Sequence, residues 1–199
     1  MADAGRVIAG SAKGVRLAAP GPGTRPLADR VKQTLFAVLE PEIEGAVVLD
    51  LFAGSGAGGI EALSRGASRA VFVERDGGAA RVIAENLRRA GLAQRGEVVR
   101  RDAVAWLADP SGAATAGPFD IVLVDPPYAD TDALAHALGL VGPHLAPRGV
   151  VVAKHFWRDA PPGGTGLLAS VRERRFGETA LTFYRRWDAP PEREEAGEE

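Results

Sequence analysis

Between residues 46 and 153, short apolar runs alternate with segments in which apolar residues recur every three or four positions. Runs of the first kind are typical of strands buried on both faces, and segments of the second kind are typical of amphipathic helices. Where the two alternate, each helix carries the chain back to begin the next strand in the same direction. The alternation therefore predicts an α/β fold whose mostly parallel sheet is covered by helices on both faces.

The expected elements of this fold follow from the same pattern. Two further apolar runs surround Gly177, which predicts antiparallel strands at one edge of the sheet. The predicted sheet then has seven strands, at residues 46–51, 70–73, 98–99, 119–124, 150–153, 167–176 and 179–187. One predicted helix of this region follows the glycines after the first strand and ends near Arg65. The others span residues 79–90, 103–108 and 134–145.

Ahead of the sheet, residues 6–10 and 15–18 predict a β-hairpin, and residues 27–40 have a helical spacing that ends at Pro41. A length of 199 residues is typical of one domain with a small appendage. The last twelve residues hold six acidic side chains and one arginine, which predicts a disordered tail. We therefore divide the chain into a hairpin arm at residues 1–24, a main domain at 25–187 and an acidic tail at 188–199.

The arm is basic, although the whole chain has a net charge of −2. The first 34 residues carry six basic side chains and two acidic ones. Such a segment suits contacts with the phosphates of a nucleic acid, although an ordinary solvated surface would also explain it. The residues expected to make these contacts are Arg6, Lys13, Arg16, Arg25, Arg30 and Lys32.

Several classes of protein are excluded or disfavoured by what the sequence lacks. It has no cysteine, so disulfides and thiolate catalysis are excluded. Its three histidines are scattered without the spacing of a metal-binding helix, so we expect no metal. No apolar run approaches the length of a membrane span, and the N-terminus lacks the apolar segment of a signal peptide. We expect a cytoplasmic protein that does not contact a membrane.

A glycine-rich segment follows the first strand of the predicted sheet and begins with Asp50. Glycines at 54, 56 and 59 fit the dinucleotide pattern GxGxxG, and glycines at 54, 56 and 58 fit the methyltransferase pattern GxGxG. Glu74 ends the second strand, where an acid can accept hydrogen bonds from ribose hydroxyls. These features predict a cofactor that contains adenosine and leave its identity open.

The four residues Asp125, Pro126, Pro127 and Tyr128 directly follow the predicted strand at 119–124. They suit an enzyme that methylates the exocyclic amine of a base, whose nitrogen lone pair is delocalised into the ring. The Asp125 carboxylate and the Pro126 carbonyl can accept hydrogen bonds from that amine, and Tyr128 offers a ring on which a flipped base can stack. We therefore predict that these four residues are catalytic and that the cofactor is S-adenosylmethionine.

A weaker pattern is the pair Asp102 and Ala103, just after the third strand. In this fold the position lies beside the adenine ring, where a carboxylate can accept a hydrogen bond from the amino group. Asp102 is equally suited to cap the helix predicted at residues 103–108. Both roles are compatible.

Together these motifs resemble the bacterial RsmD-type 16S rRNA guanine-N2 methyltransferases. The resemblance covers nearly the whole chain, although many methyltransferases share the glycine loop and the Asp125 to Tyr128 motif. More specific segments are Arg25-Pro26 followed by Asp29 to Lys32, and Leu63 to Gly66 at a helix end. The family usually has asparagine where this chain has Ala37, and tyrosine where it has Phe176. These departures leave the catalytic loop intact.

The resemblance implies a class I (Rossmann-like) methyltransferase with an N-terminal β-hairpin extension. It also implies that the partner is 16S rRNA within a partly assembled small ribosomal subunit, and we expect the enzyme to be a monomer. Arg175, in the Arg-Phe-Gly segment, joins the expected RNA contacts. The expected cofactor contacts are Asp50, Phe52, Ala53, Gly54, Ser55, Gly56, Glu74, Arg75, Asp102 and Ala103.

Three other functions remain open from the sequence. A DNA adenine-N6 methyltransferase would use the same acceptor loop, although 199 residues leave no room for a sizeable DNA-recognition domain. A nicotinamide oxidoreductase would need a substrate base such as a tyrosine–lysine pair, which the sequence does not offer. In a non-catalytic assembly factor of the same fold, we would expect substitutions in the glycine loop or in the Asp125 to Tyr128 motif, and both are intact here.

Overall fold

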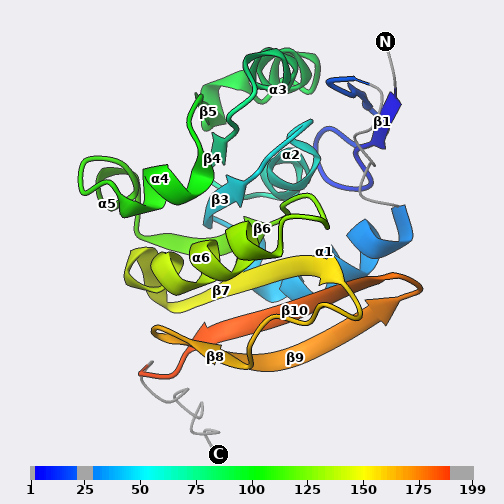
Figure 1. Cartoon of the computed structure of the whole chain (residues 1–199). Helices are drawn as coiled ribbons and strands as arrows, with labels where there is room; N and C mark the ends of the chain where they lie inside the picture. Colours follow the sequence, from blue (N-terminus) through cyan, green and yellow to red (C-terminus); the bar gives the residue numbers. More distant parts are fainter. Residues whose placement is uncertain (1–2, 22–28, 189–199) are drawn as a thin grey trace, which may run out of the picture.

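The computed structural model describes residues 3–21 and 29–188, arranged around one central sheet (Figure 1). Its strands run in the order β5-β4-β3-β6-β7-β10-β9-β8. The first five of these are mutually parallel, and the last three continue the sheet antiparallel to their neighbours. The strands are β3 Val47–Leu51, β4 Arg69–Val73, β5 Gly96–Val99, β6 Phe119–Val124, β7 Leu145–Phe156, β8 Gly164–Thr165, β9 Leu168–Phe176 and β10 Thr179–Arg186. The predicted α/β fold with a mostly parallel sheet is confirmed.

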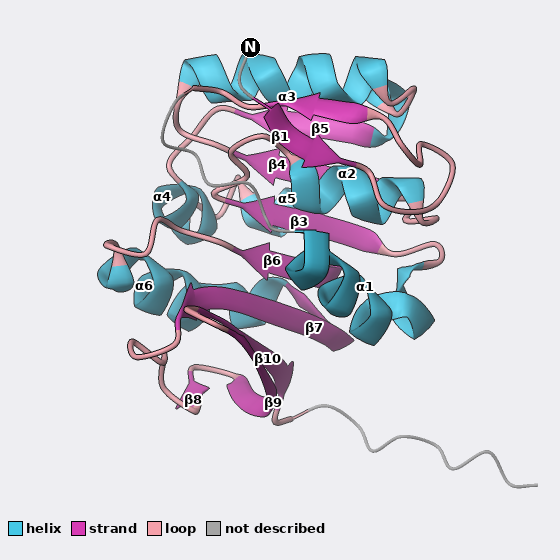
Figure 2. Ribbon diagram, turned by 90° about the vertical axis from the view of Figure 1, so that its right-hand side faces the viewer, coloured by secondary structure: helices cyan, strands magenta, loops and turns pink. Residues whose placement is uncertain are grey.

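Helices cover both faces of the sheet, which Figure 2 shows edge-on. Successive strand residues point to opposite faces, so Val48 packs in the core beneath α1 to α3 while Leu49 packs beneath α4 to α6. This explains the continuous apolar runs in the sequence, since both faces of each strand are buried. The helices are α1 Asp29–Ile43, α2 Ala57–Ser64, α3 Gly77–Arg89, α4 Ala103–Ala108, α5 Ala113–Ala116 and α6 Thr131–Val141, with 3₁₀ turns η1 Ala93–Arg95 and η2 Gly142–His144.

The described part of the arm forms a separate two-stranded sheet of β1 (Asp3–Arg6) and β2 (Arg16–Ala18). The predicted hairpin is present, but its first strand lies earlier than residues 6–10. The reason is that the backbone N–H groups of Ile8 and Ala9 donate to the carboxylate of Glu61 instead of to β2. Leu17 of the arm is buried in the same core as α1 to α3, so the arm packs firmly on the main domain.

Other predicted boundaries differ for local reasons. Pro41 does not end the first helix, because α1 continues to Ile43, whose burial in the core holds the last turn in place. The helix predicted at 134–145 ends earlier, at Val141, and Pro143 lies in the 3₁₀ turn that follows. An eighth strand, β8, has two residues and is too short to produce a periodic pattern. The predicted tail lies outside the described residues except for Asp188.

Candidate active site

A cavity of about 960 Å³ opens at the carboxyl ends of β3, β4 and β6. Open α/β sheets bind ligands at this edge, because the loops that leave neighbouring parallel strands meet there. Its walls combine the glycine-rich turn after β3, the end of β4, the start of α4 and the loop after β6. Motifs that lie far apart in the sequence therefore share one space.

The turn after β3 has an unusual backbone that brings its atoms close to the cavity. Phe52 has a φ of 58°, which is uncommon for a residue other than glycine. Gly54, with a φ of 56°, lines the cavity, and a Cβ atom there would find nothing nearer than 3.9 Å. The predicted contacts Phe52, Ala53, Gly54 and Ser55 all line the cavity. Gly54 therefore leaves open space in which a ligand can approach the backbone.

The other glycines of the motif serve packing. Gly56 does not line the cavity, and a Cβ atom there would lie 3.1 Å from Ile83. A Cβ atom at Gly58 would lie 2.7 Å from Leu123, and one at Gly59 would lie 2.4 Å from Phe72. Both positions need glycine because α2 lies so close to the sheet.

Two carboxylates hold this turn in place. Asp50 is buried, and its Oδ2 accepts a hydrogen bond of 2.8 Å from the N–H of Gly59. Burial raises the pKa of Asp50 to about 7. The hydrogen bond from Gly59 lowers this pKa, whereas the negative charges of Asp125 and Glu74 raise it further. Glu74 accepts from the N–H of Gly54 at 2.9 Å. A carboxylate oxygen has two lone pairs, so Glu74 can still accept from a ligand hydroxyl.

The remaining predicted cofactor contacts also reach the cavity. Asp102 is the N-cap of α4 and accepts a hydrogen bond of 3.0 Å from Ala105. It lines the cavity together with Ala103 and Arg75. The capping role predicted for Asp102 is therefore observed, and its position leaves the ligand role open.

The loop after β6 brings all four predicted catalytic residues to the cavity. The Tyr128 hydroxyl and the Thr179 Oγ1 atom lie 2.6 Å apart, which ties the loop to the start of β10. Lys154 donates a hydrogen bond of 2.6 Å to Asp125 Oδ1, and its ammonium group is 5.1 Å from the centre of the Tyr128 ring. Sequence reasoning missed Lys154 and Thr179. A lysine at the end of the apolar run 150–153 was the available signal for the first of them.

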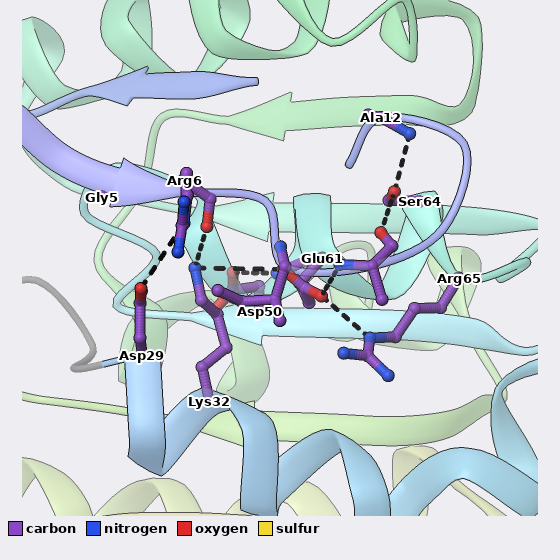
Figure 3. Close-up of polar contacts among 12 residues, drawn as sticks. Gly5, Arg6, Ala12, Asp29, Lys32, Asp50, Glu61, Ser64 and Arg65 are labelled. Carbon is purple, nitrogen blue, oxygen red and sulfur yellow. Dashed lines mark hydrogen bonds and ion pairs between the residues drawn. The ribbon is translucent and has the colours of Figure 1, made fainter. Parts of the chain in front are cut away.

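The position of Lys32 differs from its prediction as an RNA contact. Its side chain is buried, and Nζ donates to the carbonyl of Arg6 at 2.6 Å and lies 3.9 Å from Glu61 (Figure 3). Burial lowers the pKa of Lys32, and the nearby Glu61 carboxylate opposes that shift. Lys32 therefore joins the arm to α2 and does not reach a phosphate.

The other predicted RNA contacts lie at the surface or outside the described residues. Arg6, Lys13, Arg16 and Arg30 are exposed. Arg6 and Arg16 have acidic neighbours within the arm region, namely Asp29 at 3.7 Å and Asp3 at 2.7 Å. Arg25 lies outside the described residues, and Arg175 is exposed at the end of β9. The exposed residues of the arm are available to a polyanion, whereas Lys32 is not.

Metal-binding and membrane-spanning features are absent from residues 3–21 and 29–188. In these ranges no group of three histidine, aspartate or glutamate side chains could hold a metal ion. No described helix is both long enough and apolar enough to cross a membrane.

The chain is similar to known proteins over most of its length. The family model described as Conserved hypothetical protein 95 matches residues 5–185. Bacillus subtilis YlbH is 38% identical over 91% of this chain and 98% of its own length. Ribosomal RNA small subunit methyltransferase D of Escherichia coli is 36% identical over 91% of this chain and 89% of its own. The solved structure of a hypothetical protein from Thermus thermophilus superposes with a TM-score of 0.77 at 35% identity, over 90% of this chain and 98% of that one. The chain therefore belongs to this family, the RsmD family, as its motifs predicted.

Proposed function

We propose that this protein transfers a methyl group from S-adenosylmethionine to the N2 amine of a guanine in 16S rRNA. The observation that carries the proposal is the position of the Asp125 to Tyr128 loop, which faces the same cavity as Glu74 and the glycine turn. A cofactor held beside the glycine turn and a base amine held by the loop would meet inside this one cavity. The names of the relatives, which state ribosomal RNA small subunit methylation, support the same substrate.

The described residues fit the cofactor. Gly54 leaves open space beside its backbone, Glu74 has free lone pairs for ribose hydroxyls, and Asp102 lines the same cavity with a carboxylate that can accept from an amino group. When bound, S-adenosylmethionine supplies a methyl group that is already activated by the positive charge on sulfur. The chain's own residues then need to position the amine and to stabilise the charge that develops on nitrogen.

The loop after β6 is suited to that task. Lys154 donates to Asp125 Oδ1, and Asp125 Oδ2 and the Pro126 carbonyl can accept from the two N–H groups of an amine. Prolines at 126 and 127 restrict the backbone, which keeps these acceptors in place. The Tyr128 ring is held through its hydroxyl at Thr179 and can stack on the base. A guanine must leave its stack to reach this loop.

The basic residues near the N-terminus extend the proposal to the rest of the substrate. We infer that Arg6, Lys13, Arg16, Arg25 and Arg30 contact RNA phosphates, together with Arg175 at the end of β9. The substrate in this proposal is a partly assembled small subunit, and the enzyme acts as a monomer in the cytoplasm.

Methyl transfer from labelled S-adenosylmethionine tests the function. The substrates are small subunits from a strain lacking the gene, naked rRNA and duplex DNA, each with wild type and Asp125→Ala. We expect label in a 16S guanine, identified as N2-methylguanine by nucleoside mass spectrometry, and a loss of at least about a hundredfold in the variant. Label in DNA adenine would support methylation of a base amine but contradict 16S rRNA as the substrate. Cofactor binding without transfer to any substrate would favour an assembly factor.

A further inference from the structure

Two arginines lie against one indole just outside the cavity. Trp157 follows the last residue of β7, and the guanidinium carbon of Arg175 is 3.5 Å from the centre of the Trp157 ring. The guanidinium carbon of Arg158 is 5.0 Å from the same ring. Both arginines are exposed, and the tryptophan is partly buried. An aromatic face attracts a guanidinium group and orients its plane.

This group is connected to the active site through a row of aromatic rings. The Tyr128 and Phe156 rings are 6.3 Å apart between centres, and the Phe156 and Trp157 rings are also 6.3 Å apart. Because Phe156 pairs with Thr179, the end of β7 lies beside the β9–β10 turn (Figure 1). The N–H of Trp157 donates to the carbonyl of Glu178, a residue that lines the cavity. The two arginines therefore sit close to the proposed base platform.

Neither arginine is neutralised by an acid in the described ranges, residues 3–21 and 29–188. Two arginines on the neighbouring strand β10 do have carboxylate partners, namely Arg185 with Glu42 and Arg186 with Asp188. Arg175 uses Nε to donate to the carbonyl of Gly177 at 3.0 Å, which leaves its terminal N–H groups available. Two stacked guanidinium groups with free donors favour an anion that can take bidentate hydrogen bonds.

We propose that Trp157 holds Arg158 and Arg175 as a clamp, the Trp157 clamp, for an RNA backbone phosphate next to the target guanine. The inference rests on the proposed function, since a base that enters the cavity remains joined to a phosphate on each side. Those phosphates must stay near the cavity, and Trp157, which holds both guanidinium groups, is hydrogen-bonded through its backbone N–H to Glu178 in the cavity wall. Stacking on the indole restricts the side-chain conformations of each arginine before RNA arrives. Less conformational entropy is therefore lost when the Trp157 clamp binds RNA.

The first test compares RNA binding by wild type with the double variant Arg158→Gln, Arg175→Gln across a range of salt concentrations. We expect the dissociation constant for the 16S rRNA substrate to rise about tenfold and the slope of log K against log[salt] to flatten by roughly 0.7 to 0.9 for each arginine. Arg172→Gln is the matched control, because Arg172 is exposed on β9 and no ring contact is found for it among the described residues. A double variant that behaves like this control would overturn the Trp157 clamp.

The second test addresses the indole. Trp157→Ala keeps both charges but removes the platform, so we expect the dissociation constant to rise severalfold, while Trp157→Phe retains most of the affinity. Wild-type binding by Trp157→Ala, alongside weak binding by the double variant, would overturn the Trp157 clamp because the arginines would then act without the indole. Unchanged cofactor binding and unfolding temperature in the double variant establish that the fold is intact.

The third test separates the Trp157 clamp from the proposed reaction. Once the modified guanine is mapped, its flanking phosphates are replaced by neutral methylphosphonates, and we expect wild type and double variant to bind this RNA equally. Wild type that binds RNA without methylating it, together with a weaker double variant, would contradict the proposed reaction while still showing that the two arginines hold an RNA phosphate. Wild type that binds no RNA would overturn both.

Discussion

Lys154 Nζ lies 2.6 Å from Asp125 Oδ1, which joins the end of β7 to the proposed catalytic loop after β6. The sheet register explains the contact, because Ala153 pairs with Val124, and the residues that follow them, Lys154 and Asp125, form the ion pair. The ammonium group also faces the Tyr128 ring. One cation thus orients both the proposed acceptor and the proposed base platform.

Replacing this lysine should slow methyl transfer. We expect Lys154→Met to lower kcat about tenfold with little change in cofactor affinity, because Asp125 would no longer be held in one orientation. Lys154→Arg keeps the charge and a donor, so it should recover part of the rate. Single-turnover methylation assays with both variants measure the effect. Wild-type kcat in Lys154→Met would show that Asp125 is positioned without the lysine.

Asp50 should make the protein less stable as the pH rises from about 4 to about 7. Burial raises its pKa from 3.8 to about 7 in the folded state, so in this range the folded chain holds a proton that the unfolded chain releases. The stabilising effect of that proton is complete below pH 4 and is lost as the pH passes 7. Each unit of pKa difference corresponds to about 1.4 kcal/mol.

Urea unfolding of wild type and Asp50→Asn at pH 5 and pH 8 tests this linkage. Asparagine keeps an acceptor for the Gly59 N–H but does not titrate, so the variant should lose less stability between the two pH values than wild type. An equal loss in both proteins would mean that Asp50 does not titrate in this window.

Glu61 should be the most costly side chain to remove from the contact between the arm and α2. Its carboxylate is buried and accepts from Ile8, Ala9 and Arg65, with Lys32 nearby. Glu61→Ala would leave these donors unpaired, and we expect a loss of about 3–5 kcal/mol in the free energy of unfolding. Glu85→Ala removes a more exposed pair with Arg89 on α3 and should cost only about 0.5 kcal/mol.

Equilibrium denaturation of the two variants provides the comparison. Limited proteolysis of Glu61→Ala should also cut the arm faster, since its backbone loses the anchors that hold it to α2. Equal destabilisation by both variants would show that the buried carboxylate has no special role.

Two glycines of the same motif should respond differently to alanine. At Gly54 a Cβ atom meets open space, so Gly54→Ala should cost about 1 kcal/mol through its positive φ but weaken cofactor binding strongly. At Gly59 the Cβ atom would lie 2.4 Å from Phe72, so Gly59→Ala should lower stability by about 1–3 kcal/mol. Calorimetric titration with S-adenosylmethionine and thermal unfolding separate the two effects. Full cofactor affinity in Gly54→Ala would place the ligand elsewhere.

The basic residues near the N-terminus should govern the salt dependence of RNA binding. Neutralising Arg16 and Arg25 together should flatten the slope of log K against log[salt] by nearly two units. Lys32→Met should leave the slope unchanged at any salt concentration where the variant is folded, because Lys32 is buried. Filter binding at several salt concentrations gives both slopes. An unchanged slope in the double variant would contradict the proposal that Arg16 and Arg25 contact RNA phosphates.

The sequence alone was sufficient for the features that depend on neighbouring residues. Apolar runs identified the central strands because both faces of each strand are buried. The Asp125 to Tyr128 motif directly follows such a strand in the structure, as it does in the sequence prediction, and it lines the cavity. Gly54 has a positive φ, which glycine adopts without strain, so a glycine at this turn agrees with the glycine-rich segment read from the sequence. Helix ends and the two-residue strand β8 were less predictable, since burial of Ile43 and pairing with β9 decided them.

Only the tertiary structure decided which distant side chains meet. Lys32 looks like a surface cation in the sequence, yet α1, α2 and the arm enclose it beside Glu61. The same holds for Lys154 beside Asp125 and for Arg175 on Trp157, whose partners are 29 and 18 positions away along the chain. The sequence pattern around a residue predicts its secondary structure. Its burial and its ion-pair partners depend on how all the surrounding helices and strands pack, which the local pattern does not contain.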